Sequence, residues 1–254
     1  MRRAVRLSSV LTPLTVAGCL PAAATAEGRA IGTLYLGFVA IAVLIGLFVF
    51  GLATFAIVRY RVRARPEASR GRTDPARPGE TLDEGPLPPQ TRGSFRLEAL
   101  WTGLPIVTVL VLFGFTLLVL NRVEARADQP GAELRVEAFR WGWTFRYPAE
   151  DVAVSGIGEP GPEVVVPVGE PIRVTVAAAD VNHAFYVPQF LFKRDAIPGR
   201  ESVFDLTIEE PGAYRGQCAE FCGIYHARMP FTIRAVPRAE YETWLAAQPR
   251  ESAP

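Results

Sequence analysis

The chain has few side chains that bind metals. Its 254 residues include three cysteines, two histidines and two methionines, one of which is the first residue. It contains no Cys-x-x-Cys-His motif, which excludes a haem attached covalently to this chain. The few Cys, His and Met residues are also unevenly placed, because both histidines, two cysteines and one methionine fall between His183 and Met229.

Charge is absent from two long stretches. Ala30 to Val58 has no charged residue in 29 positions, and Ala99 to Leu120 has none in 22. About 20 apolar residues cross a bilayer, and a soluble helix of this length without a polar face would be unusual. We therefore predict transmembrane helices over residues 30–58 and 97–120.

The charged residues outside these stretches predict the topology. Residues 59–98 hold nine Arg and six acidic residues, and four of the Arg directly follow the first stretch. Such residues stay in the cytoplasm, so we expect residues 59–96 to be a flexible, Arg- and Pro-rich cytoplasmic linker rather than a nucleic-acid contact. Residues 121–254 hold 14 basic and 19 acidic residues. This part should lie in the periplasm or outside the cell, held by a two-pass anchor in the lipid of a bacterial cell membrane.

Residues 1–26 are typical of a signal peptide, with a basic start and a short apolar region. Two cleavage sites compete. Val16-Ala17-Gly18-Cys19 resembles a lipoprotein box that would leave Cys19 lipidated, whereas Ala24-Thr25-Ala26 fits ordinary cleavage. We favour the first, and in neither case do we count Cys19 among the candidate metal ligands.

Two thiols, an imidazole and a thioether lie between Cys218 and Met229. Sulfur ligands select soft ions, and a Met beside Cys and His is typical of copper electron-transfer sites rather than zinc. Alternatives are a buried helical stripe, from the i, i+4, i+8 spacing, or a structural zinc site. A glycine inside the segment and a proline after it disfavour a helix. With His183 as the only histidine besides His226, we predict a copper site.

The spacing of these residues also resembles a known family. The similarity to the binuclear copper domain of cytochrome c oxidase subunit II extends from the first membrane segment to about Trp244. It is carried by Cys218-x-Glu220-x-Cys222-x-x-x-His226-x-x-Met229, by Asp180-x-x-His183 and by Lys193-x-Asp195-x-x-Pro198-Gly199-Arg200.

This resemblance implies a copper A centre of two copper ions. The two cysteines would bridge the ions and each histidine would bind one of them. The methionine would be a weak ligand, and the glutamate would bind through its backbone carbonyl while its side chain reaches a magnesium ion bordering the catalytic subunit. The implied ligands are His183, Cys218, Glu220, Cys222, His226 and Met229.

After residue 121 the pattern changes to strands punctuated by Pro and Gly. We predict an all-β, cupredoxin-like sandwich or barrel with antiparallel strands over residues 121–249, attached to a helical membrane hairpin. An amphipathic helix over Arg238–Gln248 should close it. The predicted strands are Leu134–Tyr147, Glu163–Val168, Ile172–Ala177, Ser202–Glu209 and Phe231–Ala235.

An aromatic run spans Trp141 to Tyr147. The resemblance implies that Trp141 receives electrons from cytochrome c. For Trp143, Phe145 and Tyr147 we prefer core packing, the usual role of an aromatic run in a strand.

Two charged residues bear on partners. Arg146 stands where many relatives have an acidic residue that helps to dock the cytochrome, and Asp151, Asp180 and Asp195 could compensate. Glu98, at the start of the second apolar stretch, acts physically as a helix cap. The resemblance implies that Glu98 lies at the mouth of a proton channel in the catalytic subunit.

The predicted function is electron entry in a respiratory cytochrome c oxidase. Electrons from cytochrome c would pass to the haem of subunit I, where oxygen reduction drives proton pumping; subunit III is a further expected partner. Glu98 disfavours the copper subunit of a nitric oxide reductase, and the full ligand set disfavours a quinol oxidase subunit or a structural accessory protein. Nitrous oxide reductase is a much larger soluble chain. A thioredoxin-like copper-delivery protein would need a βαβ pattern, which is absent after residue 121.

Overall fold

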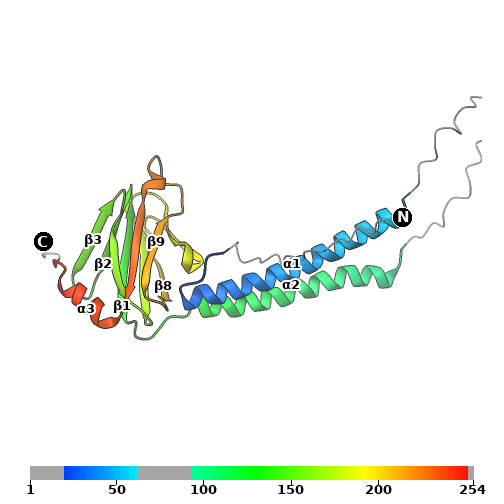
Figure 1. The fold of residues 1–254 in the computed structure, drawn as a ribbon, viewed down its shortest axis with the longest axis horizontal. Coiled ribbons are helices and arrows are strands. Elements are labelled where there is room, and N and C mark those ends of the chain that lie inside the picture. The colour runs from blue at the N-terminus through cyan, green and yellow to red at the C-terminus, as the bar shows by residue number, and fades with distance from the viewer. Residues whose placement is uncertain (1–19, 62–92, 251–254) are drawn as a thin grey trace, which may run out of the picture. The chain divides into compact units, whose positions relative to one another are not determined.

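The computed structural model describes residues 20–61 and 93–250 (Figure 1). They form two compact units: one holds the chain up to Tyr35 together with everything from Leu117 onward, and the other holds Leu36–Thr116. The predicted signal peptide up to residue 19, with Cys19, and residues 62–92 of the predicted linker lie outside the described residues.

Two long helices carry the apolar stretches. Helix α1 spans Ala26–Arg59 and α2 spans Phe95–Val123. Both are long and apolar enough to cross a membrane, as their length and composition show. Their apolar side chains are largely exposed in the isolated chain, as expected of surfaces that face lipid or partner helices.

The remainder is a sandwich of two five-stranded sheets, which together with the helices confirms the predicted fold class. The first sheet has the order β3-β2-β1-β5-β8, built from β1 Ala132–Phe139, β2 Gly142–Tyr147, β3 Val152–Ile157, β5 Pro171–Ala178 and β8 Ser202–Thr207. The second has the order β4-β10-β9-β6-β7, built from β4 Glu163–Pro167, β6 His183–Val187, β7 Phe192–Ala196, β9 Gly212–Cys218 and β10 Pro230–Val236. The short helices are η2 Pro188–Phe190, η3 His226–Arg228 and α3 Arg238–Ala246.

Two details differ from the predicted sandwich. The strands are not all antiparallel, because β1 pairs in parallel with β5 and β4 pairs in parallel with β10. The two strands of each pair are not consecutive in the chain. Other strands lie between them, which allows the second strand to run in the same direction as the first. The predicted single strand over residues 134–147 is a hairpin, since the chain reverses at Arg140 and Trp141 and pairs Phe139 with Gly142.

The core lies between the two sheets. Trp143, Phe145 and Tyr147 alternate along β2 and are fully buried, which confirms their predicted role in packing. The Phe231 ring of β10 lies 5.0 Å from that of Trp143 and 5.4 Å from that of Phe145. Gly216 of β9 pairs with Phe231, and a Cβ at Gly216 would lie 2.1 Å from this ring. The missing side chain at Gly216 therefore makes room for this aromatic cluster.

Candidate metal centre

Two neighbouring strands bring the predicted ligands together at one end of the sandwich. The loop between β9 and β10, orange in Figure 1, begins at Cys218 and ends at Met229. Strand β6 lies beside β9, with Phe185 paired to Cys218. His183, two residues before Phe185, therefore reaches the same end of the sheet, since alternate residues of a strand share a face.

His183, Cys218 and Cys222 form the buried part of the cluster. Their ligand atoms all lie within 4.8 Å of one another. The Cys218 Sγ is 3.8 Å from the His183 Nδ1 and 3.9 Å from the Cys222 Sγ. All three residues are buried, so a metal held between them would be shielded from water.

The other three predicted ligands lie nearby, in the loop itself. The Cys222 Sγ lies 3.6 Å from the His226 Nδ1 and 3.4 Å from the Met229 Sδ. The Cys218 thiol donates to the backbone carbonyl of Glu220 at 3.2 Å. Two thiol sulfurs, two imidazole nitrogens and a thioether suit a soft metal such as copper(I) better than a hard cation.

Asp180 orients His183. Its Oδ1 lies 3.0 Å from the His183 Nε2, and because a carboxylate only accepts, this nitrogen carries the proton and leaves Nδ1 free to face the sulfurs. The backbone N–H and the Nε of Arg140 donate to the Asp180 Oδ2 at 2.9 and 3.1 Å. Burial opposes ionisation of Asp180, but these hydrogen bonds outweigh it and hold its pKa well below the usual range. The i, i+3 spacing of Asp180 and His183 was the sequence signal for this pair; nothing in the sequence pointed to Arg140.

The two thiols differ in their readiness to ionise. Burial raises the pKa of Cys218, but the hydrogen bonds around its sulfur, with His183, His226 and the backbone, together outweigh burial and lower the pKa to about 6. Burial and the nearby negative charge of Cys218 raise the pKa of Cys222 to about 12. Two thiolates this close repel each other, so both are ionised together only when cations offset their charge.

Two tryptophans hold the loop through its backbone. The Trp141 Nε1 donates to the carbonyl of Cys222 at 3.2 Å, and the Trp143 Nε1 donates to the carbonyl of Met229 at 3.0 Å. Gly223 has a φ of +119°, and a Cβ there would lie 3.3 Å from the Trp141 ring. A glycine therefore suits both the backbone conformation and the close approach of Trp141.

The outer rim of the loop is apolar and exposed. Phe221 is 79% exposed and Ile224 is 81% exposed. Tyr225, 48% exposed, makes an edge contact with Trp141 at a ring distance of 4.9 Å. Apolar side chains gathered at the mouth of a buried site are typical of a surface that contacts another protein.

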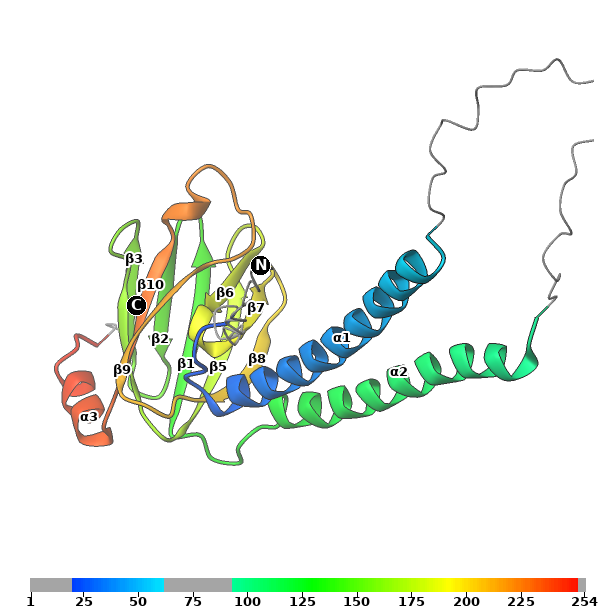
Figure 2. The same ribbon diagram turned by 45° about the vertical axis from the view of Figure 1, so that its right-hand side comes forward.

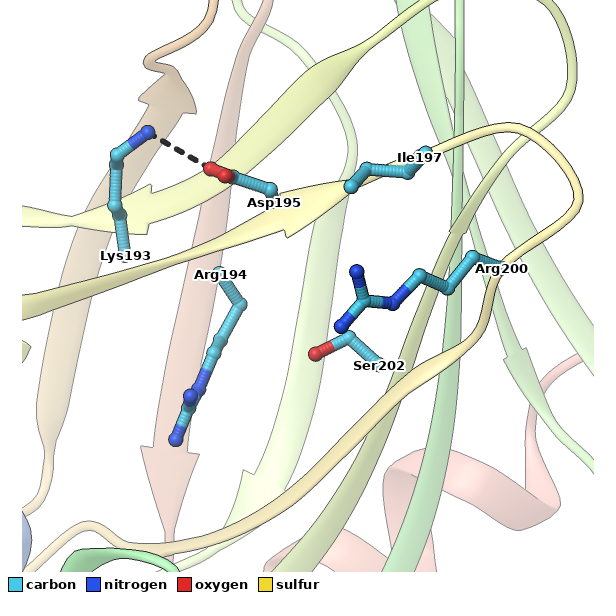
Figure 3. Close-up of a pocket in the computed structure, with 6 residues that line it drawn as sticks. All are labelled: Lys193, Arg194, Asp195, Ile197, Arg200 and Ser202. Atoms are coloured by element: carbon cyan, nitrogen blue, oxygen red, sulfur yellow. Dashed lines mark hydrogen bonds and ion pairs between the residues drawn. The ribbon is translucent and has the colours of Figure 1, made fainter. Parts of the chain in front are cut away.

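A basic hollow lies beside the loop, on β7. Lys193 donates to the Asp195 Oδ1 at 2.7 Å and to the Glu220 Oε2 at 3.1 Å. Figure 3 shows the Lys193–Asp195 contact and, beyond it, the guanidinium groups of Arg194 and Arg200. The hollow has a volume of about 250 Å³ and is lined by Lys193, Arg194, Asp195, Ile197, Arg200 and Ser202.

The acidic residues expected to offset Arg146 are largely engaged elsewhere. Asp180 is paired with Arg140 and His183, and Asp195 is paired with Lys193. Asp151 lies at the start of β3 with a φ of 58°.

Glu98 is not part of the cluster. It lies in the first turn of α2, in the other compact unit, and is exposed.

Comparisons with known proteins find relatives of this chain. A family model described as cytochrome c oxidase subunit II, periplasmic domain, matches residues 153–236. A probable cytochrome c oxidase subunit 2 of Streptomyces coelicolor is 30% identical, over 94% of this chain and 84% of the relative. Cytochrome c oxidase subunit 2 of Corynebacterium glutamicum is also 30% identical, over 89% of this chain and 74% of the relative.

Among solved structures, the periplasmic domain of subunit II of cytochrome oxidase of Bradyrhizobium japonicum is 34% identical. The match covers 48% of this chain and 96% of that chain, with a TM-score of 0.46.

Proposed function

Since the chain belongs to the cytochrome c oxidase subunit II family and is therefore a subunit of a haem-copper oxidase, we propose that it is the electron-entry subunit of its complex. The observation that supports this proposal most is the buried cluster of His183, Cys218 and Cys222. Trp141 lies next to it and donates a hydrogen bond to the Cys222 backbone. Electrons from cytochrome c enter beside Trp141 and leave toward the haem of subunit I, where oxygen reduction is coupled to proton pumping. This chain does no oxygen chemistry itself.

The proposed site holds two copper ions. Cys218 and Cys222 would hold the ions through their thiolates, His183 and His226 would bind through their imidazoles, and Met229 and the Glu220 carbonyl would be the remaining ligands. When bound, the copper pair supplies a one-electron relay. Asp180 fixes the His183 ring and the two tryptophans fix the loop backbone, so little rearrangement accompanies a change of charge.

The side chain of Glu220 is the proposed contact to magnesium at the border with subunit I. It lies half-buried beside Lys193, which donates to it at 3.1 Å. Carboxylate oxygen is the ligand that magnesium prefers. In the complex, Glu220 would be shared between Lys193 and the metal.

The exposed rim of Phe221, Ile224 and Tyr225 supports a protein partner at the loop. We assign this surface to cytochrome c, because its Tyr225 makes an edge contact with Trp141. Asp180 and Asp195 are already paired with basic side chains, and Arg146 of β2 is itself basic. We therefore expect apolar contact to contribute more than charge to binding at this surface.

The rest of the chain anchors this domain. Helices α1 and α2 cross the plasma membrane in contact with lipid and with subunits I and III, the linker over residues 59–96 faces the cytoplasm, and the sandwich lies outside. Glu98, exposed in the first turn of α2, is then at the cytoplasmic side, where it would serve the proton-channel mouth of subunit I.

The change Trp141→Phe in the complete oxidase tests electron entry. Phenylalanine keeps an aromatic ring but loses the hydrogen bond to the Cys222 carbonyl, so reduction of the enzyme by cytochrome c, followed by stopped flow, should slow. The copper spectrum should stay the same, because Trp141 is not a ligand. Trp244→Phe, at a partly buried tryptophan of α3, is the matched control and should keep the native rate. A native rate in Trp141→Phe would refute this entry point.

A further inference from the structure

The residues that precede α1 form backbone hydrogen bonds with the β-sandwich. The backbone N–H of Ala24 donates to the Gln189 carbonyl at 2.8 Å, and the Ala24 carbonyl accepts from the Glu209 N–H at 3.0 Å. Thr25 forms an antiparallel bridge with Ile208 and is fully buried. Figure 2 shows this segment in dark blue beside the yellow turn at η2. A segment held on both sides by backbone hydrogen bonds is an integral part of a fold.

The same residues build the start of α1. The Thr25 Oγ1 accepts from the Gly28 N–H at 2.9 Å, and the Thr25 carbonyl accepts from the Arg29 N–H at 3.0 Å. Thr25 is therefore the N-cap of the helix. The Glu27 carboxylate accepts from the Thr207 N–H at 3.1 Å, so the first helical turn is also tied to the end of β8.

Gly28 allows the helix to lie against the sandwich. It is buried, and a Cβ at this position would lie 2.6 Å from the Phe190 carbonyl oxygen. By contrast, nothing lies within 4 Å of a Cβ placed at Gly37, farther along the same helix. Close backbone approach at Gly28 is thus a local feature of the contact with η2.

Cleavage after Ala26 would destroy this arrangement. It would remove the Thr25 cap and place a positive α-amino group on Glu27, at the helix end where positive charge is unfavourable. It would also leave the Glu209 N–H and the Gln189 carbonyl without their Ala24 partners.

We propose that Ala24–Gly28 is a clip that holds the β-sandwich to the start of α1, and that the leader is cut upstream of Ala24. Among the sites in the sequence, the bond before Cys19 satisfies this condition and the bond after Ala26 does not. The clip joins the sandwich to the first turn of α1, and both lie in the same compact unit.

The first test is the intact mass of the chain, measured on oxidase purified from membranes. The expected mass includes Ala24, Thr25 and Ala26, whether or not Cys19 carries an added lipid. The substitution Ala26→Leu removes the small residue needed for cleavage after position 26, and should leave the start of the mature chain unchanged. A native chain that starts at Thr25, Ala26 or Glu27 would overturn the proposal.

The second test measures the clip by hydrogen exchange of the purified oxidase. Gly28→Ala should speed exchange of the Glu209 amide on the order of fivefold, as expected for the loss of a capped, paired segment. Gly37→Ala is the matched control and should not change it. Should Gly28→Ala fail to assemble, Thr25→Val removes the capping hydroxyl at nearly constant volume and should speed exchange of the Gly28 amide. Native exchange in the variant that assembles would refute the clip.

Discussion

Asp180 is not a proposed ligand, but it should influence how tightly the site binds metal. Its carboxylate fixes the His183 ring by accepting from Nε2 and is itself held by Arg140. Without that hydrogen bond the imidazole could rotate or protonate on the nitrogen that faces the sulfurs. The affinity for metal should therefore depend on a side chain outside the coordination shell.

The substitution Asp180→Asn tests this dependence. We expect the affinity for copper to fall by about 10–100-fold, the usual cost of losing such a partner of a ligating histidine. Competition with a copper chelator measures it on the purified chain. Asp128→Asn, at an exposed aspartate before β1, is the control. Equal affinities in the two variants would show that Asp180 does not position His183.

Met229 is predicted to tune the site rather than to hold it. Its sulfur lies 3.4 Å from the Cys222 Sγ and the residue is 1% exposed. Met229→Leu is nearly volume-conserving and should cost less than about 1.5 kcal/mol in stability. We expect copper to be retained and its reduction potential to shift, because a weak axial ligand tunes it. Voltammetry that gives the native potential would count against Met229 as a ligand.

At the scale of elements, β9 and β10 carry the loop as a rigid hairpin. Their pairing ends at Gln217 and Pro230, next to the two residues that bound the loop. Below it, Phe231 stacks on Phe185 at 5.0 Å and contacts the ring of Trp143. Since Trp143 donates to the Met229 carbonyl, core packing and loop position are linked through one side chain.

The substitution Phe231→Ala should lower the free energy of unfolding by about 3–5 kcal/mol, the usual cost of deleting a buried aromatic side chain. It should also weaken copper binding, because the cavity frees Trp143. Chemical denaturation of the purified chain measures the first effect and chelator competition the second. Ile157→Ala, at a side chain that is 72% exposed, is the control. Native stability in Phe231→Ala would show that the cluster does not support the loop.

Sequence patterns were enough to predict some of the helices and strands but not others. The uncharged stretches predicted α1 and α2 because lipid selects for apolar residues along the whole helix. Four predicted strand ranges coincide closely with β4, β5, β8 and β10, which are rich in β-branched or aromatic residues. Strands β3, β7 and β9 were not predicted, because Gly, Lys, Arg and Asp in them obscure the alternation. Strand β6 was missed because its residues are mostly buried and show no alternation of polar and apolar side chains. The hairpin at Arg140 and Trp141 was missed because neither residue is typical of a turn.

The candidate ligands were easier to identify than the strands that carry them. Cys, His and Met are so rare in this chain that their clustering was informative by itself. The supporting contacts, Arg140 to Asp180 and Lys193 to Glu220, join residues 40 and 27 positions apart through strand pairing. No local pattern encodes such contacts, since common polar residues have many possible partners.

The whole molecule has two helices that could cross a membrane and a β-sandwich whose described residues include a buried cluster that could hold a metal. The anchor keeps the domain at the membrane surface, and the sandwich supplies a stiff frame. The exposed rim of the loop offers a place for a partner. The proposed electron entry needs the anchor, the sandwich and the exposed rim together.

The most direct test of this account is the copper content of the chain, purified in detergent away from the other subunits and reconstituted with copper. Elemental analysis should give two copper ions per chain, with an electron paramagnetic resonance signal shared over both, and Cys218→Ser should lose that signal. One copper per chain, zinc in preference to copper, or an unchanged signal in Cys218→Ser would contradict the binuclear site.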